Sequence, residues 1–416
     1  MHILFSIMAH IILKNEKIIK CFDNCYCILL KETMYHFDSI HEKRKQQLAL
    51  ACDNLKYSHS YLEGSSDQNA KRNFLLDRNH NVFVCRVEKI GSKFIVSFLQ
   101  QLEKNHMQRI LEKEKNNFVR EQLIARKLTL VSDLPHISYT DMHYSIIKSF
   151  KFMFVREPYG KLVSGYVDKF LMPNTLFWST VGRYAYKIQH GTDIKCGHNL
   201  SFPDFLRYVV YVEHIGEHTN RHFTSINDHC RPCDIPYDFI GKMETFKDDF
   251  KTLMDTWNNI YDTNVTFGDF ESETAYDRAM FYSKRLFGMK SGIEKCVSFM
   301  EGMKRTWIGL QIQGIVSKYS HFPFSKSDVP DMNLERFQKA VSDAIKTITD
   351  KAAVNNQKHE AVVEAYSLVP LRDVISIREL VRTDCKLFGY DDSPNFIFEK
   401  NKRRRNISLQ YFKTFH

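Results

Sequence analysis

Three short runs of apolar residues along the chain have the pattern of buried strands. They are residues 81–87 (NVFVCRV), Phe150–Val155 (FKFMFV) and residues 237–241 (YDFIG). Nearly continuous apolar runs of this length are typical of strands that are covered on both faces of a sheet. We therefore predict that the three runs form strands of one sheet.

Helical periodicity follows the first two runs. After a Gly91-Ser92 turn, residues 93–126 are first apolar along one face and later strongly charged. The second run ends before Pro158, which suits the first position of a helix over residues 159–170 because proline has no N–H to lose there. A strand, a turn and a helix thus occur twice, at the spacing of a crossover connection. The pattern predicts an α/β fold with a parallel sheet flanked by helices.

The remainder of the chain is predicted to be largely helical. After the third run, Thr245-x-x-Asp248 has the spacing of an N-terminal helix cap. The closing helix ends at Phe388-Gly389, where glycine is a natural C-terminal cap. We expect a leader or stem over residues 1–80, the folded domain over residues 81–395, and a basic tail over residues 396–416.

Charge narrows the class of partner. The formal net charge is +10, from 59 Lys+Arg against 49 Asp+Glu, and this excess suits a polyanionic ligand. Nucleic acid is not expected, because no nucleic-acid-binding motif accompanies the charge. The Lys402–Arg405 run is interpreted as a solvated tail, with contact to an acidic glycan as the alternative.

The N-terminus carries no clear membrane anchor. Residues 3–13 are apolar, but a spanning helix needs about 20 apolar residues, and charged residues follow from Lys14 on. A second apolar stretch, residues 18–30, also contains charges. We interpret the region as a buried or frayed terminal element, with a degraded signal anchor as the alternative.

Ten cysteines and three N-glycosylation sequons bear on the compartment. Cys230-x-x-Cys233 invites a zinc or redox interpretation, but no second pair completes a zinc site, so we expect no metal. If the chain is lumenal, we expect Cys230 and Cys233 each to form a structural disulfide with some other cysteine. The sequons at Asn199, Asn264 and Asn406 permit a secretory location.

Both strand–turn–helix units carry residues suited to phosphate binding. In the first, residues 85–94 place a lysine and a hydroxyl before a helix N-terminus, whose free N–H groups attract phosphate. Gly91 there lets the backbone approach a ligand closely. In the second, Arg156 leaves the carboxyl end of a strand, and Ser164 follows about two turns along the helix. The alternatives are an ordinary turn with an exposed lysine, and an Arg156 paired with a carboxylate while Ser164 packs.

Together these units resemble the 5′-phosphosulfate and 3′-phosphate motifs of the carbohydrate sulfotransferases, in the group that includes the chondroitin 4-O-sulfotransferases. The second unit is close to the family pattern in residues 156–159 and 162–166 and in Asp168-Lys169-Phe170. The resemblance covers about residues 82–392. Further matches follow in family order: His222-Phe223, Cys230-x-Pro232-Cys233, residues 237–242 with Glu244-Thr245, and Asp384 with residues 387–390.

The resemblance implies a P-loop-like sulfotransferase fold and a glycan sulfotransferase that uses 3′-phosphoadenylyl sulfate (PAPS) as donor and no metal. The acceptor would be an acidic or neutral glycan, chondroitin-like, dermatan-like or related, and the enzyme a type II Golgi membrane protein with a lumenal catalytic domain. Lys89 would stabilise charge on the bridging oxygen as the sulfuryl group leaves, while Arg156 and Ser164 would hold the 3′-phosphate. The residues implied for donor binding are Glu88, Lys89, Ile90, Gly91, Ser92, Lys93 and Phe94, and then Arg156, Glu157, Pro158, Tyr159, Gly160, Lys161, Leu162, Val163 and Ser164.

Two positions depart from the family pattern, which usually has proline at the place of Glu88 and threonine at the place of Lys93. Glu88 puts a negative charge beside the phosphate loop, which should weaken donor binding unless its side chain points away. Lys93 could offset that charge but lacks the hydroxyl. A catalytically weakened, glycan-binding pseudoenzyme is therefore the alternative function. A nucleotide kinase or P-loop NTPase is disfavoured, because no Walker A sequence is present.

The acceptor hydroxyl needs a base, and His222 is the candidate. A histidine stands at the matching His-aromatic position of the family, and histidine titrates near neutrality. A hydrogen-bonded structural role is the alternative for His222. His218 and His229 are nearby rivals, and Glu88 is a further one.

Overall fold

The computed structural model divides into two compact units, Met1–Ile40 and His41–His416. In the first unit, strands β1 (Ile19–Phe22) and β2 (Tyr26–Leu29) form an antiparallel pair. The elements described below belong to the second unit, apart from the first two residues of helix α2 (Ser39–Leu55). The structure describes residues 19–22, 26–29, 39–55, 73–77, 80–92, 94–100, 102, 129–130, 147–216, 220–261, 265, 270–399 and 411–412.

The second unit contains a five-stranded sheet in the order β5-β3-β4-β6-β7. Strands β4 (Val82–Cys85), β6 (Phe150–Val155) and β7 (Phe239–Lys242) are parallel to one another. They coincide with the three predicted runs, so the prediction of a parallel arrangement is confirmed for them. Strand β3 (Phe74–Asp77) is antiparallel to β4, and β5 (Thr129–Leu130) is antiparallel to β3, so the whole sheet is mixed.

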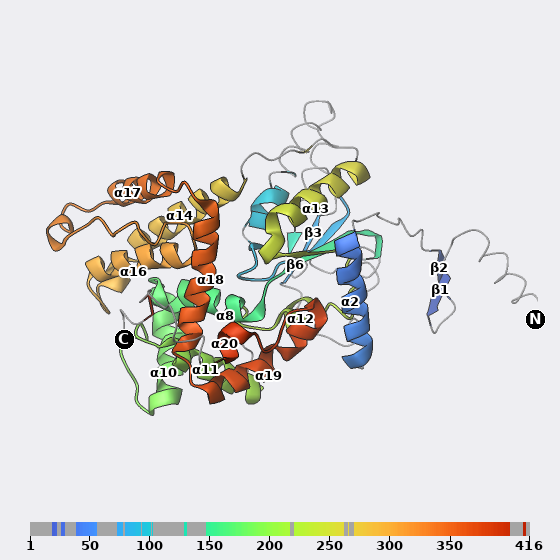
Figure 1. Cartoon of the computed structure of the whole chain (residues 1–416), viewed down its shortest axis with the longest axis horizontal. Coiled ribbons are helices and arrows are strands. Elements are labelled where there is room, and N and C mark those ends of the chain that lie inside the picture. The colour runs from blue at the N-terminus through green and yellow to red at the C-terminus, as the bar shows by residue number, and fades with distance from the viewer. Residues whose placement is uncertain are drawn as a thin grey trace, which may run out of the picture. The chain divides into compact units, whose positions relative to one another are not determined.

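Helices cover the sheet, which explains why its strands are largely apolar. Every residue of β4 and β6 is buried. Figure 1 shows helix α13 (Phe246–Tyr261) lying over the strands, and the helical residues 94–100 meet it through Phe94, whose ring centroid is 5.0 Å from that of Phe250. Helix α2 contacts β7 through His41, 4.3 Å from the Phe239 ring. The predicted α/β class with flanking helices is thus confirmed.

Helix α8 (Pro158–Tyr166) follows β6 and begins where proline predicts it. It continues as a π-helical turn, Val167–Leu171, so the predicted helix over residues 159–170 is present with a wider last turn. The predicted cap at Thr245 differs in its partner. Its hydroxyl donates to Asp249 at 2.8 Å, whereas Asp248 is exposed.

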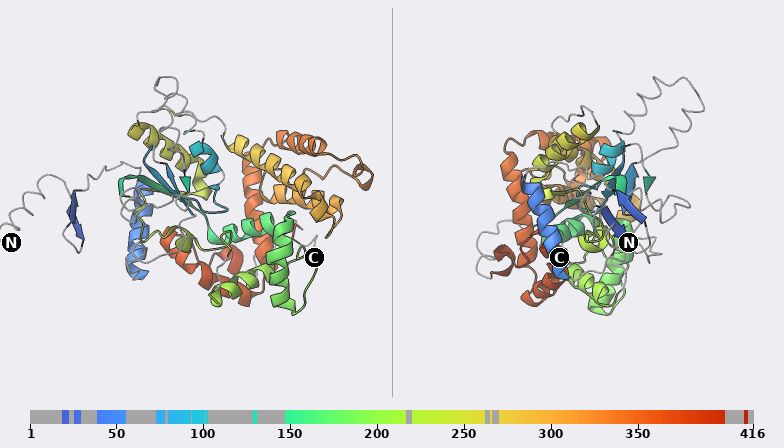
Figure 2. Two further views of the ribbon diagram at one scale, coloured as in Figure 1. Left: turned by 180° about the vertical axis from the view of Figure 1, so that it is seen from behind. Right: turned by 90° about the vertical axis from the view of Figure 1, so that its right-hand side faces the viewer.

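The C-terminal half is helical, as predicted. Its closing helix, α19 (Leu371–Phe388), ends at Gly389 in the left-handed conformation, as the sequence indicates. Figures 1 and 2 show helices α14, α16, α17 and α18 gathered on the side away from the sheet, with α8 between them and the strands. Their bounds, with those of the other long helices, are α10 (Arg183–His190), α11 (Phe202–His214), α14 (Phe270–Gly288), α16 (Phe299–Ile312), α17 (Leu334–Lys346) and α18 (Lys351–Ser367).

The folded domain extends beyond both of the expected boundaries. Strand β3 and helix α2 lie before residue 81, yet β3 pairs with β4 and Cys52 of α2 is joined to Cys233. At the other end, Phe412 is 1% exposed within the helical core, and its N–H donates to Glu364. Residues 1–80 are therefore not all leader, and residues 396–416 are not all tail. The Lys402–Arg405 run lies outside the described residues.

Three disulfides join described cysteines: Cys52–Cys233, Cys85–Cys230 and Cys196–Cys296. The expectation that Cys230 and Cys233 each pair with another cysteine is confirmed. Cys385 is a free, buried thiol. Within the described part of the chain, no helix combines the length and apolar character needed to cross a membrane.

Candidate functional site

The first candidate segment is a tight turn between β4 and the helical residues 94–100. Lys89 and Gly91 both have left-handed backbone, with φ of 68° and 66°. Glycine adopts this conformation readily, but for lysine it costs about 1–2 kcal/mol. The turn closes where the N–H of Ile95 donates to the carbonyl of Gly91 at 3.1 Å. Lys93, predicted to contact the donor, lies outside the described residues.

The Lys89 ammonium is held by a buried carboxylate. Its Nζ donates to Asp168 Oδ2 at 2.8 Å, and the side chains are 11% and 10% exposed. Arg285 Nη1 lies 2.6 Å from Asp168 Oδ1, and Lys169 Nζ lies 3.4 Å from Oδ2. Burial opposes ionisation of Asp168, but Lys89, Arg285 and Lys169 together hold its pKa well below the ordinary range. Three cations around one carboxylate give this cluster a net positive charge, which favours an anionic ligand.

Glu88, one of the two residues expected to depart from the family pattern, is engaged within the protein. Its carboxylate accepts from the Ser92 hydroxyl at 3.3 Å and lies 3.3 Å from Arg221 Nη2. The negative charge expected to weaken phosphate binding is therefore paired with a cation. Ser92, in turn, already donates its hydroxyl hydrogen to Glu88.

The second candidate segment meets the first directly. Arg156 follows the last residue of β6, and its Nη1 donates to the main-chain oxygen of Lys89 at 3.3 Å. Burial lowers the pKa of the Arg156 guanidinium; Glu244 opposes the shift and Arg278 adds to it. Because β4 and β6 are adjacent parallel strands, the two predicted cationic residues lie at the same edge of the sheet.

Glu157 caps helix α8. Its carboxylate accepts from the backbone N–H groups of Tyr159 at 3.0 Å and Gly160 at 2.6 Å. Burial raises the pKa of Glu157 to about 7, although these two hydrogen bonds favour the ionised form. The N–H of Glu157 itself donates to Glu244 at 2.8 Å. Its carboxylate is thus occupied by the start of the helix.

Other predicted residues of the second segment face the core. The side chains of Pro158, Tyr159, Leu162 and Val163 are buried, and Tyr159 donates its hydroxyl to the Asp392 carbonyl at 2.6 Å. The Lys161 ammonium donates to the Thr224 carbonyl at 2.5 Å, and burial lowers its pKa to about 8.

At the first segment, Ile90 is 1% exposed. Buried side chains such as these can support a ligand site from behind. Of the predicted residues, a donor would be contacted by their backbone groups and by the side chains of Arg156 and the half-buried Ser164.

His222 lies beside the same cations. Its Nδ1 is 2.6 Å from Asn220 Oδ1, and since an amide oxygen only accepts, Nδ1 carries the hydrogen and the Nε2 lone pair is left to take a proton. Its ring meets Phe177 edge-on at 5.4 Å, and Lys169 Nζ lies 4.9 Å from that same Phe177 ring. Burial, and then the charges of Lys169 and Lys89, lower the pKa of His222 to about 3.

The rival base His229 has a structural setting. It is 2% exposed, and its ring Nε2 lies 3.3 Å from the Arg86 carbonyl. Burial, followed by the charges of Lys161 and Arg221, lowers its pKa to about 3. His218 lies outside the described residues.

The geometry agrees with what sequence comparison finds. The sequence model of a protein family, described as the sulfotransferase family, matches residues 72–280, about half of the chain. The chain belongs to the sulfotransferase family. This confirms the predicted family, and the mixed α/β architecture fits the predicted P-loop-like fold.

Curated relatives of the chain are carbohydrate sulfotransferases. Carbohydrate sulfotransferase 8 of Mus musculus is 29% identical over 253 residues, which is 56% of this chain and 55% of the relative. Carbohydrate sulfotransferase 14 of Danio rerio is 35% identical over 134 residues, 31% of this chain and 34% of the relative. The chain therefore spans about half the length of the relatives that it matches most extensively. No solved structure gives a significant match.

Several residues around Lys89 were not predicted to be functional. Asp168 and Lys169 match the family pattern, but no function was predicted for them. Nothing in the sequence pattern pointed to Arg221 or Arg285. Asp168 is 79 residues from Lys89 and 117 from Arg285 along the chain. Only a search for charged side chains near the motifs could have raised Asp168 and Lys169 as candidates.

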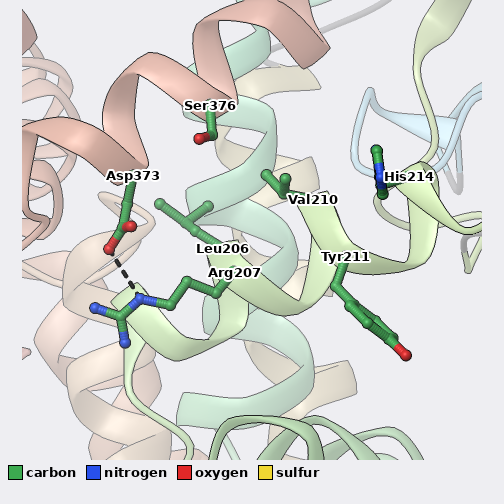
Figure 3. Close-up of a pocket in the computed structure, with 7 residues that line it drawn as sticks. All are labelled: Leu206, Arg207, Val210, Tyr211, His214, Asp373 and Ser376. Carbon is green, nitrogen blue, oxygen red and sulfur yellow. Dashed lines mark hydrogen bonds and ion pairs between the residues drawn. The ribbon is translucent and has the colours of Figure 1, made fainter.

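Two other places on the fold lie apart from this site. A hollow between helices α11 and α19 is lined by Leu206 and Val210, and its Arg207 is paired with Asp373 at 2.8 Å (Figure 3). Cys196, His198 and Cys296 have ligand atoms within 4.8 Å of one another, but the two cysteines are joined in a disulfide. Thiolates, not disulfide sulfurs, are the metal ligands. The expectation that the reaction needs no metal stays a prediction.

Proposed function

We propose that this protein is a PAPS-dependent carbohydrate sulfotransferase that transfers a sulfuryl group to a hydroxyl of a glycan. The observation that carries the proposal is the direct contact between Arg156 and the backbone of Lys89. Two cationic residues at adjacent strand ends could grip opposite ends of one doubly phosphorylated nucleotide. The glycan acceptor is supported by the chain's similarity to carbohydrate sulfotransferases 8 and 14.

The donor fits the residues that are present. Lys89, Lys169 and Arg285 supply more positive charge than Asp168 neutralises, as a phosphosulfate group requires. Arg156 and Ser164 would hold the 3′-phosphate, which distinguishes PAPS from nucleotides that lack it. The left-handed Gly91 would bring backbone N–H groups close to the 5′ end.

In the proposed reaction, the acceptor oxygen forms a bond to sulfur while the bond from sulfur to the bridging oxygen breaks. PAPS supplies the sulfuryl group and leaves as 3′-phosphoadenosine 5′-phosphate. The Lys89 ammonium would offset the charge that develops on the leaving oxygen. His222 Nε2 would take the proton of the acceptor hydroxyl, since its other ring nitrogen is bound to Asn220.

The pseudoenzyme alternative rested on Glu88 and Lys93. For Glu88, the contacts with Ser92 and Arg221 weaken that argument, because the carboxylate is already paired. Glycan binding by a catalytically weakened protein remains the second candidate function, because Glu88 and Lys93 replace the proline and threonine expected from the resemblance. The two functions differ in turnover, not in fold.

The deciding experiment is transfer of labelled sulfate from PAPS to a panel of glycans, including desulfated chondroitin, dermatan and neutral N-glycans. We expect transfer to at least one acceptor, and a loss of about a hundred- to a thousandfold in Lys89→Met. Calorimetry with 3′-phosphoadenosine 5′-phosphate accompanies the assay. Binding without transfer to any acceptor would identify the pseudoenzyme, and absence of binding would remove the donor assignment altogether.

We also propose a lumenal location in the Golgi, with membrane anchoring as the resemblance implies. Supporting it, the three disulfides join cysteines 181, 145 and 100 residues apart, and such bonds persist in oxidising compartments. Asn199, in one of the sequons, is exposed. Expression in cultured cells with and without N-glycosidase treatment tests this. A mobility shift that is reduced in Asn199→Gln supports the location, and an unglycosylated, fully reduced protein would contradict it.

A further inference from the structure

The contacts of Asp168 use its whole carboxylate. Oδ2 accepts from Lys89 at 2.8 Å, and Oδ1 accepts from Arg285 Nη1 at 2.6 Å. Arg285 also donates through Nη2 to the main-chain oxygen of Asp168 at 3.1 Å. Arg285 therefore fixes both the side chain and the backbone of Asp168, which leaves the second oxygen aimed at Lys89.

These three residues come from separate elements. Lys89 is in the turn after β4, Asp168 is in the π-helical turn Val167–Leu171, and Arg285 is in the last turn of α14. Arg285 also lies beyond residues 72–280, the part matched by the family model. The C-terminal helical half thus reaches the lysine of the donor turn through one carboxylate.

Stability alone gives no good account of this arrangement. Taking charged groups out of water costs free energy that their attraction often only just returns. Here three cations surround one carboxylate, so repulsion between the cations adds to that cost. Lys89 also occupies the left-handed region, which is unfavourable for lysine. Costs of this kind tend to gather where a side chain must be held in one place for function.

We propose that Asp168 is a positioning residue that holds the Lys89 ammonium where the sulfuryl group leaves, and that Arg285 fixes Asp168 for this task. The inference rests on the proposed function, because it assigns Lys89 to the leaving oxygen. A lysine side chain has four rotatable bonds, so an unheld ammonium would spend little time at one point. Preorganised charge is worth most when it does not have to move as the reaction proceeds.

This role separates binding from turnover. The Asp168 carboxylate lies beside the place of an anionic donor, so it should slightly oppose donor binding. Its hold on Lys89 should matter in the transition state. Asp168→Asn is therefore expected to lower kcat by about ten- to a hundredfold, while affinity for 3′-phosphoadenosine 5′-phosphate stays the same or tightens by about two- to fivefold. A damaged fold would weaken both.

The test is a double-mutant cycle with Asp168→Asn, Lys89→Met and the combined variant, read by turnover with the acceptor found above and by calorimetry with 3′-phosphoadenosine 5′-phosphate. If Asp168 acts through Lys89, adding Asp168→Asn to Lys89→Met should lower turnover less than about threefold. Multiplicative losses, or a fall in nucleotide affinity that parallels the fall in kcat, would overturn the inference. Absence of transfer by the unmodified protein would instead overturn the proposed function.

A second variant covers the case in which Asp168→Asn does not fold. Arg285→Gln leaves the Asp168–Lys89 pair in place but removes its support, so we expect a kcat loss of about three- to tenfold with unchanged nucleotide affinity. Arg305→Gln is the matched control, because the Arg305 side chain is also shielded from solvent (4% exposed, against 10% for Arg285) and bonds to Glu301 at 3.0 Å and to the His198 carbonyl at 2.8 Å, away from Lys89. Equal kcat in Arg285→Gln and Arg305→Gln would contradict the role of Arg285.

Discussion

The turn that carries Lys89 is held by distant parts of the chain, whereas the start of the helix after Arg156 is specified by adjacent residues. The first is tied by the Cys85–Cys230 disulfide, by Asp168 and by Arg221. In the second, Glu157 caps the helix that it precedes and Pro158 starts it. The start of helix α8 can therefore be predicted from adjacent residues, whereas the contacts that hold the Lys89 turn, such as that between Glu88 and Arg221, join residues far apart in the sequence.

Of the substitutions that test this comparison, the largest effect on nucleotide binding is expected at Arg156, which precedes the locally specified helix start. Arg156→Ala should weaken binding of 3′-phosphoadenosine 5′-phosphate by about ten- to a hundredfold, because a hydrogen bond to a charged group contributes about 1.5–3 kcal/mol. Binding of adenosine 5′-phosphate, which lacks the 3′-phosphate, should change little. Calorimetry with both nucleotides measures the difference. Similar losses for the two would mean that Arg156 acts elsewhere.

A smaller effect is expected at the turn. In Gly91→Ala the new Cβ would make only an ordinary van der Waals contact, with the Met243 sulfur at 3.5 Å. The left-handed φ of 66° is nevertheless unfavourable for alanine by about 1–2 kcal/mol. Both thermal stability and nucleotide affinity should fall.

Gly191→Ala is the matched control for that change. Gly191 has a φ of 71° with open space around it, at the end of α10. Its replacement should lower the melting temperature similarly and leave nucleotide affinity unchanged. Parallel losses of affinity in both variants would show that the turn has no special part in binding.

The smallest effect concerns the protonation of His222. Its pKa is lowered to about 3 by burial and by the charges of Lys169 and Lys89. The imidazole should therefore stay neutral as the pH falls from 7 to 5, where an ordinary histidine would become charged.

Binding of 3′-phosphoadenosine 5′-phosphate adds negative charge beside those lysines, so the pKa of His222 should rise in the complex. NMR titration of the ring with and without nucleotide measures both values. An ordinary pKa in the free protein would show that the ring is not held among these cations.

Much of the fold could be predicted because its signals are local. The runs at residues 82–85 and 150–155 could be predicted as buried strands because they are nearly continuously apolar, and Pro158 and Gly389 mark helix ends through their own backbone preferences. Strand β3 escaped prediction because it follows a long polar stretch and itself ends in a charged residue, Asp77. The boundary at residue 396 was misplaced because two buried aromatic residues, 411 and 412, follow a basic run.

The sequence by itself determined the family, the parallel strands and the two candidate cationic residues, Lys89 and Arg156. Only the tertiary structure decided that Asp168 and Arg285 hold Lys89, that Arg221 neutralises Glu88, and which cysteines pair. Strand and helix signals depend on neighbours within a few residues, and so they can be read along the chain. The contacts around Lys89 join residues 79 and 117 positions apart, and they exist only because the packing of the helices against the sheet brings those residues together.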